Sequence, residues 1–403
     1  MQSALVLARR GIGKTSPNPA VGAVLHSRGE RIAEGFHARF GGPHAERRLL
    51  ASLAGRRVPS RAVLCLTLEP CAHHGKTPPC VEALLASRIQ RFVIATADPN
   101  PTVRGRGIRA LRADGREVRV GLLAREAREL NAPFFIAHTQ GRARVSLKIA
   151  SSLDGMLADF EGHSRWITGG RARRAVGRLR AIADAVVVGR GTVEKDDPRL
   201  RATPGNRYTP TRIVIDSRLA IEPGCRLARI WRREVGSLPR DADEGERVGN
   251  WVPRWNRVGG LRWVRRPRLI AVTADPPAAR RSLFLRSGWE VWDLPGSGGH
   301  VDLLALARRA SREGLHDLLV EPGPRLAAGF LSVGPVDRIL MFVSPRILGG
   351  DRGWTGHLGP LPLKQSLRIK LGAKIERFGE DLLIQAIRMR ARGSVQRGRG
   401  RMR

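Results

Sequence analysis

The sequence predicts two α/β domains joined by a short linker. Residues 1–140 alternate helix-type and strand-type segments, and the alternation starts again near 143 with "ARVSLKIASSLDG". Alternating helices and strands indicate layered α/β sheets. Between the two blocks, "TQGR" at 139–142 is polar and contains a glycine, as a linker should. At 403 residues the chain is long for one core and comfortable for two.

The first domain, residues 1–140, opens with a helix and a Pro-rich loop, "TSPNPAVG". Two short strands then flank the Arg-Gly turn of "AVLHSRGERIAEGFHA". A later helix has Pro79 in its first turn, where proline is favoured. In chain order we expect helix 2–11, the two strands, helix 44–55, strand 61–68, helix 79–87, strand 91–96, helix 105–113, strand 117–120 and helix 123–132.

The second domain, residues 143–387, repeats the alternation. We expect helix 170–182, strands 184–188, 211–216 and 268–273, helix 277–287, strand 289–292, helix 301–312, strand 316–320 and helix 324–332. Between 222 and 267 the alternation of helix-type and strand-type segments stops. This stretch holds four of the eight tryptophans. It shows no clear period, so we predict an insertion that is partly ordered at best.

The net charge of +36 is extreme. Such a charge fits nucleic-acid binding, but nearly all the basic residues are arginines spread along the chain. A compositional bias towards arginine therefore explains the charge better, and no specific nucleic-acid partner is expected. The tail at 388–403, "RMRARGSVQRGRGRMR", reads as disordered and solvated.

The apolar segments and cysteines indicate a soluble cytoplasmic protein. No apolar run approaches the roughly 20 residues that a membrane helix needs. The apolar segment of the N-terminal "MQSALVLARRG" is too short for a signal peptide. Four irregularly spaced cysteines are too few for a disulfide framework, which favours metal binding or catalysis for paired thiols.

A metal site is indicated by "GGPHAERRLL" and "TLEPCAHHGKTPPC". Together they give the H-x-E … P-C … C signature of zinc nucleotide deaminases, in which one histidine and two cysteines bind zinc. The ligands would be His44, Cys71 and Cys80, leaving one zinc position for a water molecule. Glu46 would not be a ligand but would move the proton of that water to the departing amine.

The alternative is a closed structural zinc site or a set of unrelated buried thiols. A closed site would take a fourth ligand from His73, His74 or His37. A glutamate two residues after the ligand histidine would then have no role, so we favour the catalytic site.

The loop between the cysteines departs from the nucleic-acid deaminases, which have C-x-x-C instead of C-x8-C. It resembles instead the RibD family of bifunctional riboflavin-biosynthesis deaminase–reductases. "TSPNPAVGAV", "GGPHAE", "TLEPCAHHGKTPPC" and "DPNPTVRGRGI" are similar to the deaminase half, in order and at family spacing. The resemblance implies a cytidine-deaminase-like three-layer α/β/α fold. It also implies substrate contacts from Asn18, His73 and Lys76.

The second half resembles the reductase half of the same family through "SLKIASSLDG", "SRWITG", "VGRGTVEKDDPRL", "TRIVIDS" and "LLVEPGPRLAAGF". The resemblance implies a dihydrofolate-reductase-like α/β fold that uses NADPH. No convincing G-x-G-x-x-G follows a strand, so the residues alone do not give this cofactor. "EPGPRLAAG" and "GRGT" do follow predicted strands and could present backbone N–H groups to a phosphate.

The resemblance also assigns residues in this half. The implied NADPH-contacting residues are Ala150, Trp166, Thr168, Thr192, Asp196, Ser217, Gly323, Pro324, Arg325, Leu326, Ala327, Ala328 and Gly329. The implied reductase substrate residues are Lys148, Ser164, Arg180, Leu200 and Glu321. One departure is Thr203, which stands where the family commonly has an arginine, so Arg199 or Arg201 would have to replace that phosphate contact.

The predicted function is therefore two consecutive steps of riboflavin synthesis on a pyrimidine ribosyl phosphate. The first half would release the 2-amino group of a diamino-ribosylamino-pyrimidinone 5'-phosphate as ammonia. The second half would reduce the ribosyl group of that product to ribityl with NADPH, and the chain could form a homo-oligomer through this half. The alternatives are a polynucleotide deaminase that uses the basic charge, and a non-catalytic zinc scaffold with a nucleic-acid-binding tail. The C-x8-C loop and the second half argue against the former, and Glu46 argues against the latter.

Overall fold

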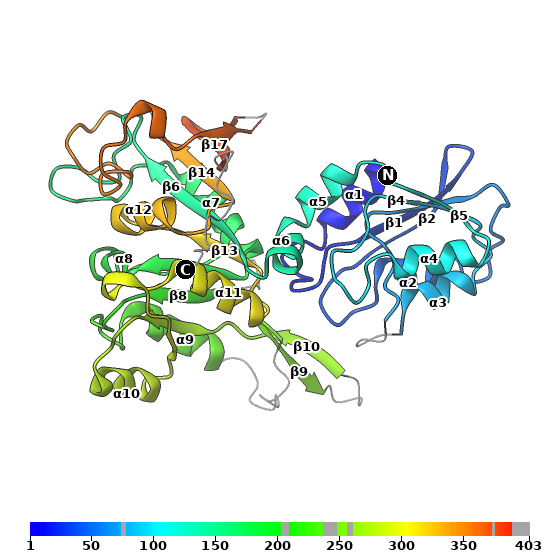
Figure 1. Ribbon diagram of the computed structural model, residues 1–403, viewed down its shortest axis with the longest axis horizontal. Coiled ribbons are helices and arrows are strands. Elements are labelled where there is room, and N and C mark those ends of the chain that lie inside the picture. The colour runs from blue at the N-terminus through cyan, green and yellow to red at the C-terminus, as the bar shows by residue number, and fades with distance from the viewer. Residues whose placement is uncertain (74–77, 203–208, 237–247, 256–260, 373–374, 389–403) are drawn as a thin grey trace, which may run out of the picture. The chain divides into compact units, whose positions relative to one another are not determined.

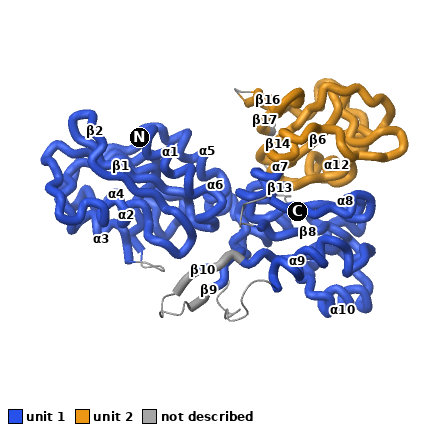
Figure 2. Tube along the Cα trace, turned by 180° about the vertical axis from the view of Figure 1, so that it is seen from behind, with its two compact units in different colours: residues 1–144, 176–319 blue, residues 145–175, 320–403 orange. Residues whose placement is uncertain are grey.

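The computed structural model describes residues 1–73, 78–202, 209–236, 248–255, 261–372 and 375–388, and many of its helices and strands are labelled in Figure 1. The chain divides into two compact units (Figure 2). The first comprises residues 1–144 and 176–319, and the second comprises 145–175 and 320–403. A boundary at 144 lies close to the predicted linker, but residues 176–319 belong to the first unit. Assignment of all of 143–387 to one domain therefore stays a prediction.

The N-terminal part of the first unit is built on a five-stranded sheet of order β2-β1-β3-β4-β5. Its strands are β1 (Gly22–Ser27), β2 (Glu30–Phe36), β3 (Val63–Leu66), β4 (Arg91–Ile94) and β5 (Glu117–Val120). Strand β1 is antiparallel to β2 and β3, while β3, β4 and β5 run parallel. The carboxyl ends of β3 and β4 therefore meet at one edge, and the loop that carries Cys71 follows β3.

Helices cover both faces of this sheet (Figure 1). They are α1 (Gln2–Arg9), α2 (Ala45–Ser52), α3 (Cys80–Leu85), α4 (Arg106–Ala113), α5 (Ala124–Leu130) and α6 (Ala132–Gln140). Leu25 and Leu64 lie in one core with residues of α2, α3 and α4, whereas Val24 and Cys65 pack with α1. Successive strand residues point to opposite faces, so this alternation produces the three-layer α/β/α arrangement. The predicted helix 123–132 corresponds to α5, and a further helix that was not predicted, α6, follows it directly.

The remainder of the first unit holds the strand order β12-β11-β8-β7-β13. The strands are β7 (Ala185–Gly189), β8 (Thr211–Ile215), β11 (Leu269–Thr273), β12 (Glu290–Asp293) and β13 (Asp317–Val320), with helices α8 (Arg190–Asp196), α9 (Arg226–Gly236), α10 (Ala278–Arg286) and α11 (Leu303–Arg312). The pairs β7–β8, β8–β11 and β11–β12 run parallel. Strands β7 and β11 are almost entirely apolar and buried, as central strands of a parallel sheet are.

Regular elements occur within 222–267, where the sequence showed no clear period, and the assignment of this stretch as an insertion stays a prediction. Helix α9 buries Leu227, Ile230 and Val235 on one side, but its four arginines obscure that period in the sequence. Strands β9 (Trp251–Trp255) and β10 (Leu261–Arg265) form an antiparallel hairpin. Trp251 and Trp263 of this hairpin pack on Phe40, so two of the tryptophans fill a small core. Residues 237–247 and 256–260 lie outside the described residues.

The second unit contains the strand order β6-β14-β17-β15, with β16 paired to β17. Its elements are β6 (Arg144–Ser151), α12 (Pro324–Ser332), β14 (Arg338–Val343), β15 (Ile369–Leu371), β16 (Glu376–Phe378) and β17 (Asp381–Arg388); helix α7 (Gly170–Ile182) crosses the unit boundary in sequence. Strand β6 is parallel to β14, and β17 is antiparallel to β14. The sequence analysis assigned no element after 332. Arg388, the first residue of the predicted tail, ends β17, and the rest of that tail, 389–403, lies outside the described residues.

Candidate active sites

Three metal-ligand side chains from separate segments meet in the first unit. Nδ1 of His44 lies 3.6 Å from Sγ of Cys71 and 3.3 Å from Sγ of Cys80. The ligand atoms of all three lie within 4.8 Å of one another. Histidine nitrogen and cysteine sulfur are preferred zinc ligands, and three of them leave a fourth tetrahedral position open. The cluster expected from the sequence therefore forms and could hold a zinc ion.

Two helix starts bring these side chains together. His44 is the N-cap of α2, and Cys80 is the first residue of α3, directly after two prolines. The backbone N–H of Cys80 donates to Sγ of Cys71 at 3.2 Å. Arg47 of α2 donates to the carbonyl of Pro78 at 3.2 Å. The prolines restrict the backbone ahead of α3, and the two hydrogen bonds connect that backbone to the other ligand segments.

The charges of the three ligand side chains depend on one another. The hydrogen bond between the thiols lowers the pKa of Cys71 to about 4 and raises the pKa of Cys80. Burial would lower the pKa of His44, but its hydrogen bond to Cys71 and the nearby Glu46 carboxylate outweigh burial and raise it. Metal binding needs thiolates and a neutral imidazole. The low pKa of Cys71 favours its thiolate form, whereas Cys80 would have to lose its proton to bind a metal.

Glu46 lies in the first turn of α2, two residues after His44. Only 3% of its surface is exposed. Burial raises the pKa of this carboxyl, although the neighbouring His44 opposes the shift. Its Oε2 atom has no hydrogen-bond partner among the described residues. This carboxyl is buried, has a raised pKa and one unpaired oxygen, and lies beside the group of metal-ligand side chains. Such a carboxyl is suited to accept and donate a proton.

In the second unit, Lys148 of β6 and Glu321 after β13 form an ion pair. Nζ and Oε2 lie 3.2 Å apart, and 14% and 10% of the two side chains are exposed. Both stand at positions that the resemblance assigns to the reductase substrate. In the same unit Ala150 and Ser164 are half-buried, Thr168 is buried, and exposed Trp166 lies under the guanidinium of Arg173, 4.4 Å from the ring centre.

The run Gly323–Gly329 forms the start of α12. Gly323 is its N-cap, and Pro324 is its first residue. The first N–H groups of a helix have no partner within the helix, so this end can donate hydrogen bonds to an anion. As the sequence predicted, "EPGPRLAAG" follows a strand and opens a helix, and its binding of a phosphate stays a prediction.

The other reductase positions belong to the first unit. Thr192 and Asp196 lie on α8, which directly follows β7, and Ser217 follows β8. Arg180 of α7 donates to the backbone carbonyl of Arg201 at 3.2 Å. Leu200 is buried. Thr203 lies outside the described residues.

Comparison with known proteins identifies the family. Residues 143–384 match the RibD C-terminal domain, and residues 1–96 match the cytidine and deoxycytidylate deaminase zinc-binding region. The chain is 36% identical over 386 residues to riboflavin biosynthesis protein RibD of Aquifex aeolicus, which covers 95% of this chain and 96% of that relative. The chain belongs to the RibD family.

Other RibD proteins agree. The RibD protein of Escherichia coli is 35% identical over 401 residues, covering 96% of this chain and 98% of its own. A Thermotoga maritima structure, described as a diaminohydroxyphosphoribosylaminopyrimidine deaminase and 5-amino-6-(5-phosphoribosylamino)uracil reductase, superposes with a TM-score of 0.77 at 31% identity. That likeness covers 96% of this chain and 97% of the other.

Membership of the RibD family makes the chain a bifunctional deaminase and reductase of riboflavin biosynthesis. The deaminase part is of the zinc-binding type, and the reductase part is of the NADP-dependent RibD type. The predicted fold class is confirmed: the protein is α/β, with a deaminase-type N-terminal part and a RibD-type reductase part. The polynucleotide deaminase and the zinc scaffold are not favoured. No helix in the described part of the chain is long and apolar enough to span a bilayer.

The described residues also bear on the closed zinc site. The ring of His37 lies 5.1 Å from that of His44, but its Nδ1 lies 3.2 Å from the carbonyl of Pro43. His37 does not join the group of ligand atoms found among the described residues. His73 is exposed, and His74 lies outside the described residues. Three ligands, and not four, therefore converge in the described part of this RibD-type site.

The residues expected to bind the deaminase substrate are described only in part. Asn18 is half-buried in the loop ahead of β1. Asn131 fixes this loop, because its side chain accepts from the N–H of Ala20 at 2.8 Å and donates to the carbonyl of Ala20 at 2.9 Å. His73 is exposed, and Lys76 lies outside the described residues. Their substrate contacts stay predictions.

Glu69, which was not predicted as a site residue, organises the loop before Cys71. Its buried carboxylate accepts hydrogen bonds from the backbone N–H groups of Asp98 at 3.0 Å, Gly105 at 2.9 Å and Ile108 at 3.2 Å. An acidic residue at the end of the apolar run "VLCLTLEP" was the available signal, because a buried carboxylate requires partners.

Gly107 has a packing role at the same loop. A β-carbon there would lie 2.2 Å from the carbonyl oxygen of Pro70, which is closer than atoms can approach. The glycine therefore lets α4 pack directly against the backbone that leads into Cys71. Gly107 belongs to "GRGIRA", whose glycine spacing is similar to part of a dinucleotide-binding motif. The packing contact with Pro70 explains this glycine.

Proposed function

We propose that His44, Cys71 and Cys80 hold the zinc ion of the deaminase and that Glu46 is its proton carrier. The observation that supports this assignment is the convergence of three ligand atoms beside a buried carboxyl that has one unpaired oxygen. A purely structural site has no use for such a carboxyl, because burying it without partners is unfavourable.

The chemistry of the deaminase follows from these groups. A bound zinc ion would supply the Lewis acidity that lets a water molecule ionise near neutral pH. Glu46 takes the proton of that water on its carboxylate and delivers it to the amino group that leaves as ammonia. The raised pKa of Glu46 suits it to hold this proton between the two steps. Asn18, His73 and Lys76 would orient the pyrimidine ribosyl phosphate.

For the reductase we propose that Lys148 and Glu321 contact the ribosyl group, together with Ser164, Arg180 and Leu200. NADPH supplies the hydride, and the protein must hold the ribosyl carbon and provide a proton. The Lys148–Glu321 pair is largely buried, so it can present a charged hydrogen-bond donor and an acceptor to the sugar hydroxyls in a defined geometry. The α12 start from Gly323 to Gly329, with Ala150, Trp166, Thr168, Thr192, Asp196 and Ser217, would bind NADPH.

We also propose that both reactions take place in the cytoplasm on a small-molecule substrate. All four cysteines are free thiols, which a reducing compartment maintains. Self-association through the reductase half, and the absence of a specific nucleic-acid partner, stay predictions from the sequence.

The decisive experiment gives the purified protein the diamino substrate with NADPH and follows ammonia and NADPH together. We expect ammonia release to precede NADPH oxidation and the two totals to be equal at completion. The already deaminated intermediate should consume NADPH without releasing ammonia. Ammonia release with no oxidation of NADPH on either substrate would contradict the reductase assignment.

A further inference from the structure

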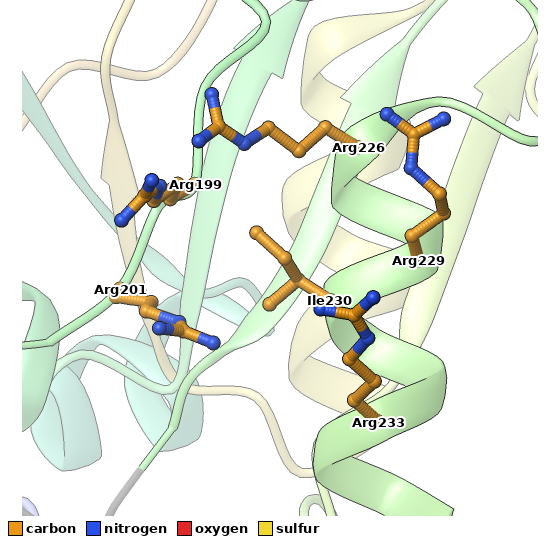
Figure 3. Close-up of a pocket in the computed structure, with 6 residues that line it drawn as sticks. All are labelled: Arg199, Arg201, Arg226, Arg229, Ile230 and Arg233. Carbon is orange, nitrogen blue, oxygen red and sulfur yellow. The ribbon is translucent and has the colours of Figure 1, made fainter.

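Helix α9 and the segment 199–201 border a half-open cavity of about 310 Å³ in the first unit (Figure 3). Five arginines and Ile230 line it: Arg199, Arg201, Arg226, Arg229 and Arg233. Figure 3 shows Arg226 and Arg201 extending from opposite sides into the space between the helix and the segment. The cavity has no role in the zinc site.

The spacing of the residues explains the arginine lining. Arg226, Arg229 and Arg233 are three and four positions apart on α9, so they share one face of the helix. In the facing segment Leu200 is buried, while Arg199 and Arg201 on either side of it are exposed. Two unrelated pieces of backbone therefore present guanidinium groups to the same space.

Carboxylates compensate this charge only in part. Glu234 lies 3.3 Å from Arg201, and Asp197 lies 4.0 Å from Arg226. Arg229 donates to the backbone carbonyl of Gly224. Within the described ranges no ion pair involves the two remaining lining arginines at 199 and 233. The cavity therefore keeps an excess of positive charge.

Buried Arg212 adds to the same excess of positive charge. Its side chain is inaccessible to solvent and pairs with Glu234 at 2.8 Å, so Glu234 is shared between Arg212 and Arg201. Nε and Nη1 of Arg212 have no hydrogen-bond partner among the described residues. Burial lowers the pKa of Arg212, and Arg201 and Arg180 lower it further by repulsion. The surroundings of the cavity thus carry less negative charge than positive charge.

We propose that this cavity binds a phosphate group and that the arginines of α9 are among its ligands. Arginine donates two parallel hydrogen bonds to phosphate oxygens, and a dianion matches several converging guanidinium groups. A half-open cavity between one helix and one short segment suits a phosphomonoester better than the backbone of a polynucleotide, which needs an extended basic groove.

The location indicates the source of the phosphate. Leu200 and Arg180 stand at reductase substrate positions, and Arg180 donates to the carbonyl of Arg201. At Thr203 the chain lacks the arginine common in the family. We therefore assign the cavity to the 5'-phosphate of the reductase substrate, with α9 replacing the missing contact. This assignment rests on the proposed function, whereas phosphate binding itself does not.

The test compares two double variants of the full-length protein with equal loss of charge. Arg229→Gln/Arg233→Gln removes two lining arginines. The control, Arg232→Gln/Arg286→Gln, removes one arginine of α9 and one of α10 that do not line the cavity. Binding of inorganic phosphate is measured by calorimetry at constant ionic strength, and the steady-state constants of the reductase are measured with the deaminated intermediate.

We expect the cavity variant to bind phosphate at least about 10-fold more weakly than wild type, and the control to stay within about 2-fold. The reductase KM of the cavity variant should be about 10-fold higher than that of wild type with little change in kcat, and phosphate should compete with the substrate.

Equal phosphate binding by wild type and the cavity variant would overturn the proposed phosphate site. Weakened phosphate binding with an unchanged KM and no competition would overturn the assignment to the substrate and show a separate phosphorylated ligand. A protein that binds phosphate but lacks reductase activity would contradict the proposed function and leave the phosphate site intact.

Discussion

Lys148 and Glu321 are 173 positions apart in the chain, yet Nζ of one lies 3.2 Å from Oε2 of the other in a largely buried ion pair. Replacing one member leaves the partner charge buried and unpaired, which is costlier than losing the pair. We expect Glu321→Gln to lower kcat/KM of NADPH oxidation at least about 10-fold, because the lysine loses its orientation as well as its counter-charge.

Ammonia release provides the internal control for this variant. The deaminase site shares no residue with the ion pair, so the same preparation of Glu321→Gln should release ammonia at the wild-type rate. Reduction as fast as that of wild type would remove Glu321 from the reductase mechanism. Loss of both activities would instead indicate a folding defect.

The zinc assignment predicts different results for a ligand and for the proton carrier. Cys80→Ser should lose zinc and deaminase activity together, because it removes one of three converging ligands. Cys225→Ser is the matched control, since this thiol is also free but lies outside the cluster, and it should keep its zinc. Zinc content by elemental analysis of the purified proteins tests both, and full retention in Cys80→Ser would exclude that residue from the site.

Glu46→Ala should keep zinc and lose at least about 10²-fold in deamination rate, which is the usual contribution of a positioned acid–base group. NADPH oxidation with the deaminated intermediate should not change. A fully active Glu46→Ala enzyme would refute the proposed proton transfer.

Zinc removal should separate the two activities in the intact chain. A chelator that strips the metal should stop ammonia release, while NADPH oxidation on the deaminated intermediate continues. The reason is chemical: the reduction needs a hydride donor, a held sugar carbon and a proton, and none of the proposed reductase residues is a zinc ligand. Re-addition of zinc should restore deamination, and a chelator that stopped both reactions would show that the metal also supports the reductase.

The sequence predicted best what depends on neighbouring residues. Helices 170–182 and 324–332 have the predicted bounds, since glycine or proline marks where each begins. The His44, Cys71 and Cys80 cluster was also predictable, because a zinc signature fixes residue types and spacing together. Helix α9 was missed because arginines occupy the positions around Leu227 and Ile230 and mask their period.

Contacts between distant residues could not be predicted from local pattern. Glu69 binds backbone groups 29 to 39 positions away, and nothing near it in the sequence shows where they lie. Lys148 and Glu321 were found only through resemblance to a family. The five arginines of the cavity come from two segments whose proximity depends on the fold, so the sequence showed the charge but not its concentration at one place.

The C-terminal tail should be dispensable for both reactions. The tail has no regularly spaced apolar residues that could be buried. Ordering it would therefore cost conformational entropy that little burial of apolar surface could offset. Because Arg388 ends β17, the deletion should remove 389–403 and leave the strand intact. We expect unchanged rates for both reactions and weaker, salt-dependent retention on DNA. Loss of either activity at moderate salt would reclassify the tail as part of a site or a subunit contact, and the mass in solution would distinguish these.

His316 should make the protein less stable in acid. Burial, together with repulsion from His138, whose ring centre lies 6.1 Å away, lowers the pKa of this histidine to about 4. In the unfolded chain the pKa is near the ordinary value of 6.5. Between these two pKa values the unfolded state binds the extra proton, so the free energy of unfolding falls as pH drops from 6.5 towards 4 and does not change through this group above 6.5.

At pH 5 the effect amounts to about 2 kcal/mol from this one histidine. His316→Gln removes the titrating group, so its thermal midpoint should fall less than that of wild type between pH 7 and pH 5. His300→Gln, at an exposed position, is the control and should follow the wild-type profile. Parallel profiles for all three proteins would show that His316 does not stay neutral in the folded state, and that the acid sensitivity has another origin.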